Sequence, residues 1–325
     1  MMDLVTQHAA AYRRGVVIPR PAVGHIWSTG ATRVDLIHRM STNDLNNLQP
    51  GEGRATVLTN AVARMVDRVV VLNLGERALL VTSAGRATAV RAWLSRYIFF
   101  NDDIKLTDAG ETLTQFDVYG PQSATWLSQW LPSAAALPLH HGREIGEGLW
   151  LMRTEALAGM GFAVIGAPAA LAEMQAQLVA QGAVVGDETL REVLRVEAGV
   201  PGPEGEVNDQ YIPLEADLWG DVSFQKGCYI GQEIIARMES RGRLAKTLVA
   251  VQAAGAVRVG MALRGPGGER GTLTSAVESP ALGWIGLGFI KPSAAESGTL
   301  LMAEDEAGAV SVQVVATPMA VAVTP

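Results

Sequence analysis

Cysteine is almost absent from this sequence, with a single residue, Cys228, among 325 positions. One thiol cannot form an internal disulfide, so the chain is expected to fold in a reducing compartment. It also cannot build a zinc finger or an all-cysteine iron–sulfur site. The five histidines include no H-x-x-x-H pair and none lies near Cys228 in the sequence, so no metal site is predicted. A G-x-S-x-G nucleophile elbow is missing as well, which excludes the usual α/β-hydrolase arrangement.

Long apolar runs and a large positive charge are also missing. No apolar stretch reaches the roughly 18–20 residues that span a bilayer, and the first residues lack the apolar core of a signal peptide. The net charge of −7 argues against a general nucleic-acid binder, because such proteins neutralise phosphates. With 48% hydrophobic and 18% charged residues, the chain is expected to be a cytoplasmic globular protein that binds neither membrane nor nucleic acid.

Apolar periodicity divides the chain into two kinds of region. Up to about residue 242, strand patterns alternate with helical patterns, and two β-branched runs separated by Gly75 and Glu76 predict a hairpin. A similar mixture recurs between residues 149 and 200, which indicates two α+β lobes of similar build. After residue 243, short strand candidates separated by Gly, Pro and acidic turns predict a small β-barrel or sandwich. We therefore expect a domain boundary near Gly242.

The local sequence around the cysteine suggests chemistry. Cys228 lies in FQKGCYIGQE, a segment that is too polar and glycine-rich to require a small apolar side chain that fills a buried space. The following residues, IGQEIIARMES, have helical composition, so the thiol is expected just before a helix and near its positive end. Lys226 lies two residues upstream, and both features favour a thiolate. The alternative is a small buried residue in a tight turn, and the residues alone support both interpretations about equally.

A second candidate is Glu197, which ends a predicted helix in front of a Gly/Pro-rich loop that is expected to be exposed. Such loops carry ligands more often than cores do. A glutamate there could accept paired N–H donors from a flat heterocycle. The residue type alone nevertheless favours an ordinary ion pair with Arg191 or Arg195.

A basic cluster follows the cysteine segment within ten positions. It is either a solvated surface or a means of steering an acidic ligand tail toward a site beside Cys228. The cluster consists of Arg237, Arg241, Arg243 and Lys246.

The segment KGCYIGQE resembles the K-G-C-Y-x-G-Q-E signature of the YgfZ family, relatives of the glycine cleavage T-protein, an aminomethyltransferase. The resemblance extends over nearly the whole chain. MSTNDLNNLQPGE, RVEAG and QYIPLEADL are similar to family segments in the same order, and GTLTSAVESPALGWIGLGFI resembles a C-terminal strand pair of T-proteins. An eight-residue signature with ordered companions is much more specific than a lone glycine motif.

The resemblance implies an α+β fold of T-protein type, a three-domain ring with a central folate site. Two interleaved α+β lobes would occupy residues 1–242 and a β-barrel residues 243–325. The implied ligand is tetrahydrofolate or a one-carbon derivative of it. The implied role is assembly or repair of iron–sulfur proteins, so these proteins or their assembly factors are the expected partners.

The resemblance also assigns site residues. Cys228 matches the characteristic functional residue of the family, with Lys226 beside it as the second expected catalytic residue. Glu197 matches the glutamate that contacts the pterin in T-proteins, which reverses the preference for an ion pair. The expected folate-binding set is Glu197, Tyr229, Gln232, Arg237 and Asp67.

Two departures from the T-protein pattern count against glycine cleavage chemistry. T-proteins carry two adjacent acids, one of them central to methylene transfer, where this chain has Asp67 followed by Arg68. Their Y-T-G-E-D-G-F-E stretch appears here only as RTEALAGMGFAV. The alternatives to the iron–sulfur role are a folate-dependent aminomethyl or one-carbon transferase and a non-catalytic scaffold that holds folate as a structural ligand.

Overall fold

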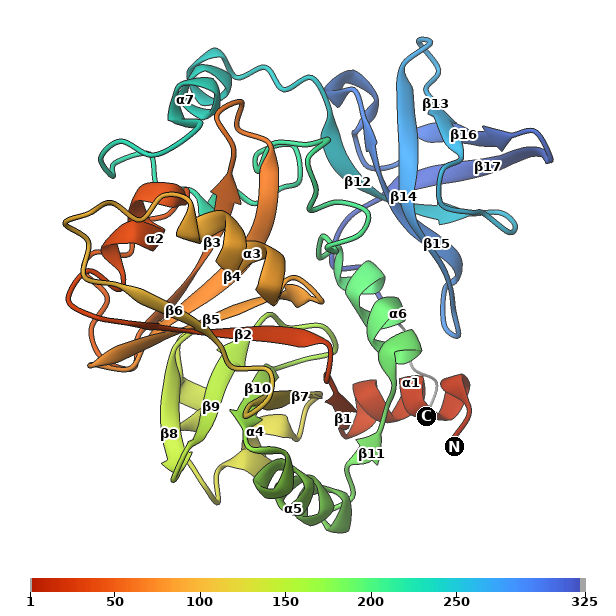
Figure 1. The fold of residues 1–325 in the computed structure, drawn as a ribbon. Coiled ribbons are helices and arrows are strands. Elements are labelled where there is room, and N and C mark those ends of the chain that lie inside the picture. The colour runs from red at the N-terminus through yellow and green to blue at the C-terminus, as the bar shows by residue number, and fades with distance from the viewer. Residues whose placement is uncertain (1, 322–325) are drawn as a thin grey trace.

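The computed structural model describes residues 2–321 of the chain. Two β-sheets and a closed β-barrel are arranged around helix α6 (Glu188–Ala198), as Figure 1 shows. Helix α6 contacts the N-terminal helix α1 (Leu4–Arg13), one sheet and the barrel. The sequence interpretation missed α1, although Asp3 caps it by accepting a hydrogen bond from the Thr6 backbone N–H at 2.9 Å.

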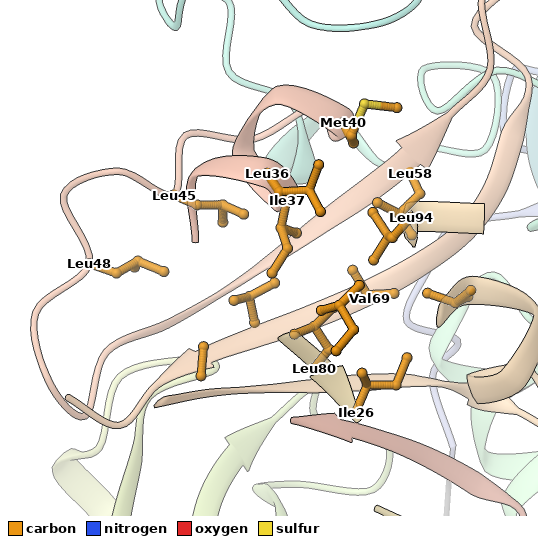
Figure 2. Packing of buried hydrophobic residues seen from close by; sticks show 14 residues of the cluster. Ile26, Leu36, Ile37, Met40, Leu45, Leu48, Leu58, Val69, Leu80 and Leu94 are labelled. Carbon is orange, nitrogen blue, oxygen red and sulfur yellow. The ribbon is translucent and has the colours of Figure 1, made fainter. Parts of the chain in front are cut away.

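The first sheet has five strands and carries helices α2 (Asp35–Met40) and α3 (Ala87–Ser95) on one face. The predicted hairpin is confirmed, since its two strands pair antiparallel. Figure 2 shows apolar side chains of α2 meeting those of the strands, and this burial fixes which face of the sheet the helices cover. The strands are, in spatial order, β3 (Gly53–Thr59), β4 (Met65–Asn73), β5 (Arg77–Ala84), β2 (Val23–Thr29) and β6 (Lys105–Asp108).

The second sheet has six strands, and helices α4 (Ser123–Leu127) and α5 (Pro168–Ala180) pack on one face of it. Its other face meets the first sheet through buried residues that include Trp150 and Leu72. The N-terminal strand β1 joins this sheet, so the two lobes are interleaved in sequence. The strands are, in spatial order, β11 (Val184–Val185), β1 (Val16–Pro19), β7 (Thr114–Tyr119), β10 (Gly161–Gly166), β9 (Leu149–Thr154) and β8 (Gly142–Gly146).

The C-terminal strands form a closed six-stranded barrel, which confirms the predicted α+β fold with a barrel after it. Strand β16 was missed because its outward residues Leu300 and Met302 are apolar and exposed, which hides the polar–apolar alternation of a half-buried strand. The barrel strands are β12 (Thr247–Ala253), β13 (Ala262–Arg264), β14 (Arg270–Ser279), β15 (Gly283–Ile290), β16 (Leu300–Asp305) and β17 (Gly308–Val315).

Between the second lobe and the barrel the chain forms helix α7 (Gln232–Arg241), which Gly242 ends in a left-handed conformation at φ 57°. Single turns of 3-10 helix complete the structure: η1 (Ala134–Ala136), η2 (Trp219–Asp221) and η3 (Pro292–Ala294). None of the helices within residues 2–321 has the length and apolar character needed to cross a membrane. The domain boundary near Gly242 stays a prediction.

Candidate functional site

The segment that carries the cysteine forms a loop between η2 and α7. Lys226 and Tyr229 are buried, whereas Gly227 and Cys228 between them are exposed. A Cβ placed on Gly227 would meet nothing within 4 Å. Two buried side chains thus hold a two-residue arch with the thiol at the surface, which excludes the interpretation of Cys228 as a buried plug. We call residues 226–229 the cysteine arch.

The predicted helix after the cysteine is present, but it begins four residues after Cys228, too late for its first N–H groups to contact the thiol. Helix α7 begins at Gln232, with Gly231 as the N-cap residue at φ 84°. A side chain at Gly231 would lie 2.8 Å from the Asn60 carbonyl oxygen, so glycine is required there. Within the described part of the chain, no hydrogen bond joins the Cys228 sulfur to the first N–H groups of α7. The predicted contact between thiol and helix terminus is therefore not observed.

Lys226 is not a neighbour that activates the thiol directly. Its ammonium group donates hydrogen bonds to three backbone oxygens, those of His38 at 2.5 Å, Ser41 at 2.7 Å and Asn43 at 2.8 Å. An ammonium has only three N–H donors, so none remains for a thiolate. Burial lowers the pKa of Lys226 to about 8, so the charged form still predominates at neutral pH. The structure shows Lys226 as an anchor of the loop, and its catalytic role stays a prediction.

Three of the expected folate-binding residues lie in or after the cysteine arch. Tyr229 packs in an apolar cluster with Ile212 and Ile235, and burial raises the pKa of its hydroxyl to about 12. Gln232 is the half-buried first residue of α7, and Arg237 is exposed on that helix. The folate contacts of these three residues stay predictions. Of the basic cluster, the side chain of Arg241 lies outside what the structure describes.

Asp67 and Arg68 point to opposite faces of the first sheet because side chains alternate along strand β4. Asp67 is buried on the face that α3 covers and accepts hydrogen bonds from the backbone N–H groups of Arg68 at 3.0 Å and Ser83 at 3.2 Å. Burial raises the pKa of its carboxyl group. Arg68 faces the other way, toward the second lobe. The expected folate contact of Asp67 is thus placed on the face away from the junction of the lobes.

At that junction Arg68 forms a cluster with residues from three other parts of the chain. Its Nε donates to Asp221 Oδ2 at 2.5 Å, and its Nη2 donates to Glu155 Oε1 at 2.6 Å. His140 Nε2 lies 3.7 Å from the same Glu155 oxygen. Sequence reasoning noted Arg68 and the altered stretch containing Glu155 as departures, but it did not foresee that these residues would meet. We call Arg68, Glu155, Asp221 and His140 the central cluster.

The charges of the central cluster are set by their mutual contacts. Burial by itself would raise the pKa of Glu155, but the charge of Arg68 brings it down to about 2. Burial opposes the charge of Arg68, yet Glu155 and Asp221 raise its pKa above the ordinary value. Burial lowers the pKa of His140, so its imidazole is neutral at pH 7. The Arg68 guanidinium is therefore held between the side chains of Glu155 and Asp221.

The central cluster also has unused hydrogen-bonding capacity. Glu155 keeps 29% of its side chain accessible, and its Oε2 receives no hydrogen bond from another residue within 2–321. His140 Nδ1 is buried without a partner in the same range. A flat heterocycle that carries N–H donors, such as a pterin, would supply a partner to the Glu155 carboxylate, whereas His140 Nδ1 is closed off from solvent. The residues present thus fit a folate-type ligand in the chemistry of their donors and acceptors.

Glu197 occupies a different environment from the one predicted. It is 1% exposed and accepts hydrogen bonds from Tyr12 at 2.7 Å and Ser279 at 2.5 Å, with His8 Nε2 at 2.8 Å. Burial and the Glu197 charge raise the pKa of Tyr12, so the phenol remains a donor. The ion pair with Arg191 or Arg195 that the residue type alone favoured is not formed, and the folate contact of Glu197 that the resemblance implies stays a prediction. Glu197 instead joins α1, α6 and the barrel.

A second buried junction was missed by sequence reasoning. Arg195 pairs with Glu206 at 3.2 Å and donates to Ser275 at 2.7 Å, and both charged side chains are at most 3% exposed. Glu206 also accepts from the Gly202 backbone N–H at 2.8 Å. The Gly/Pro-rich loop after Glu197 was expected to be exposed, but its residue Glu206 is buried against barrel strand β14. Only a tertiary contact could reveal this, because Arg195 and Ser275 are far apart in sequence.

A surface pocket of about 440 Å³ lies between the end of α7 and the barrel. Two of its lining residues, Arg243 and Lys291, are basic, and neither forms an ion pair in the described range. Part of the predicted basic cluster thus faces a concave surface. No group of three or more His, Cys, Asp or Glu side chains among residues 2–321 is arranged to hold a metal ion.

Comparisons with known proteins agree with this architecture. The sequence profile of the GCVT N-terminal domain family matches residues 1–226. An Arabidopsis thaliana protein named "Putative transferase At1g60990, chloroplastic" is 29% identical over 311 residues, which cover 91% of this chain and 70% of that protein. An aminomethyltransferase of Nostoc sp. (strain PCC 7120) is 24% identical over 315 residues, with coverages of 93% and 83%. The crystal structure of glycine cleavage system aminomethyltransferase T from Bartonella henselae has the same fold, with a TM-score of 0.82, 21% identity and coverages of 97% and 89%.

Proposed function

The chain belongs to the GCVT N-terminal domain family, and from this premise we propose that it is a tetrahydrofolate-binding protein of the YgfZ type that supports assembly or repair of iron–sulfur proteins. Cys228 is the reactive group in this proposal. The observation that carries it is the exposed thiol of the cysteine arch, held within the sequence KGCYIGQE. Iron–sulfur proteins or their assembly factors are the proposed partners.

The central cluster is the proposed site for the pterin ring. Glu155 Oε2 would accept an N–H from the amino-pyrimidine edge, while Arg68 fixes the carboxylate by holding its other oxygen. When bound, tetrahydrofolate would supply a carrier for a one-carbon unit. We prefer Glu155 to Glu197 for this contact because His8, Tyr12 and Ser279 already satisfy Glu197.

Titration with tetrahydrofolate tests this assignment. Glu155→Gln should weaken binding by roughly ten- to a hundredfold, since hydrogen bonds to a charged group are worth about 1.5–3 kcal/mol. The matched variant Glu197→Gln should change the affinity by less than about threefold, because its side chain faces α1 and the barrel. Anaerobic calorimetry gives both constants. A large loss of affinity in the Glu197 variant alone would show that the pterin contacts Glu197 and not Glu155. If the native protein does not bind tetrahydrofolate, the folate proposal is refuted.

The anionic end of folate is proposed to reach the basic pocket between α7 and the barrel. The double variant Arg243→Ala/Lys291→Ala should abolish any preference for polyglutamyl over monoglutamyl folate, a preference expected to be no more than about fivefold for exposed charges. Rising salt should erode the same preference in the native protein. Lys105→Ala is the comparison, because it removes an exposed positive charge outside the pocket. If the double variant prefers polyglutamyl folate as strongly as the native protein does, the pocket does not bind the anionic end of folate.

Two alternatives remain. The first is a one-carbon transferase, which is favoured because several relatives are named aminomethyltransferases. Arg68, which stands in place of a second acid, disfavours aminomethyl transfer. Turnover of an aminomethyl donor in the presence of tetrahydrofolate would establish the transferase. A non-catalytic scaffold would keep its cellular function when the thiol is removed. A cytoplasmic location stays a prediction, and one relative is named chloroplastic.

A further inference from the structure

The cysteine arch is fastened to the carboxyl end of the short helix α2. The last carbonyl groups of a helix lack intrahelical partners and carry the negative end of its dipole. Helix α2 ends at Met40, and the Lys226 ammonium bonds the carbonyl oxygens of His38, Ser41 and Asn43. A lysine distant in sequence thus caps α2. Because its own backbone belongs to the arch, the cap also fixes the position of the loop.

Further contacts hold the loop on either side of this cap. The Ser223 backbone N–H donates to the Thr42 oxygen at 2.9 Å, and the Ser223 hydroxyl accepts from the Lys226 N–H at 3.2 Å. On the other side, the Thr59 hydroxyl donates to the Ile230 oxygen at 2.8 Å. The Tyr229 ring lies 5.0 Å from the Lys226 ammonium, within range of a cation–π contact. Within the cysteine arch, Gly227 and Cys228 project outward between the buried residues Lys226 and Tyr229.

Lys226 differs from every other lysine of the chain. It is 8% exposed, whereas the other three are exposed, namely Lys105, Lys246 and Lys291. Burying an ammonium is costly unless its donors are bonded, and here all three are. An ordinary surface lysine would avoid this desolvation. The buried charge of Lys226 therefore serves to keep the cysteine arch ordered.

We propose that Lys226 is a positioning residue for Cys228: by capping the carboxyl end of α2, it holds the cysteine arch in one conformation with the thiol presented outward. The inference rests on the proposed function only in taking Cys228 as the reactive group. Its physical content is the order of the arch. That order can be measured without folate, iron–sulfur proteins or turnover.

A nitroxide label tests the proposal, because Cys228 is the only thiol and needs no engineering. The native labelled protein should give an electron paramagnetic resonance spectrum of restricted motion, and Lys226→Met should add a mobile component. Exchange of the Ser223 and Lys226 amide hydrogens should also become at least about tenfold faster, which corresponds to losing one or more charged hydrogen bonds. Lys226→Arg, which keeps a charged donor, should restore order in part. Lys246→Met is the control and should leave both measurements unchanged.

Identical spectra and exchange rates in folded Lys226→Met and native protein would overturn the proposal. A second measurement needs no variant and so survives a failure of Lys226→Met to fold. In the native protein at low pH and temperature, the Lys226 Nζ–H group should give an observable nitrogen–proton correlation, because three hydrogen bonds protect it from solvent. Exposed Lys105, Lys246 and Lys291 should not. If no lysine ammonium signal is protected, the anchor does not exist in solution, whatever the fate of the folate or iron–sulfur proposals.

Discussion

Cys228→Ser should abolish the ability of this protein to restore iron–sulfur enzyme activities in cells that lack it. The thiol is exposed in an arch that Lys226 anchors, and a hydroxyl in the same place is neither a comparable nucleophile nor a soft metal ligand. Folding and tetrahydrofolate affinity should be retained. The affinity should change by no more than about twofold, since exposed substitutions usually alter free energies by about 0.5 kcal/mol or less.

The measurement compares iron–sulfur enzyme activities in deletion cells that carry native protein, Cys228→Ser or Gln225→Ala. Gln225 is an exposed residue of the same loop, so its variant controls for disturbance of the surface. Native protein should also be alkylated at Cys228 without denaturation. Full restoration by the serine variant would refute a role for the thiol and favour the scaffold. Loss of folate binding in that variant would instead indicate that the cysteine and folate sites are one.

Glu206→Ala should lower the free energy of unfolding by about 1–3 kcal/mol, the usual cost of leaving buried donors without an acceptor, because Arg195 keeps Glu192 as a second carboxylate partner. Glu206 is 0% exposed and Arg195 is 3% exposed, so bulk solvent does not reach the donors that lose this carboxylate. The substitution also removes the acceptor for the hydroxyl groups of Ser275 at 2.8 Å and Thr274 at 2.5 Å. The contacts that join α6 and the following loop to barrel strand β14 would therefore all be weakened.

Glu192 provides a matched control because it pairs with the same arginine from the solvent side. Its side chain is 40% exposed, and exposed pairs contribute about 0–1 kcal/mol. Urea denaturation of the native protein and both alanine variants gives the comparison, read as shifts of the midpoint at constant slope. Similar small shifts for Glu206→Ala and Glu192→Ala would mean that the buried pair does not join the barrel to α6.

Much of the fold could be predicted because it depends on local periodicity. The hairpin around Gly75, helix α6 and several barrel strands follow from alternation, helical spacing and turn residues that neighbours along the chain supply. Strands β13 and β16 could not be predicted in the same way. One has only three residues, and the other is apolar on both faces. Barrel closure determines both, because each completes the hydrogen bonds of a neighbouring strand.

In the candidate site, the contribution of the sequence and that of the tertiary structure are easier to tell apart. The sequence by itself determined that there is one thiol, that it lies in KGCYIGQE, and that an arginine follows Asp67. It could not determine the partners of these groups. Strand parity turns Asp67 toward α3 and Arg68 toward Glu155 and Asp221, and a contact with α2 occupies Lys226. A residue type fixes which bonds a side chain can make. Only the tertiary structure decides which partners come within about 3 Å, because those partners come from segments that the sequence leaves far apart.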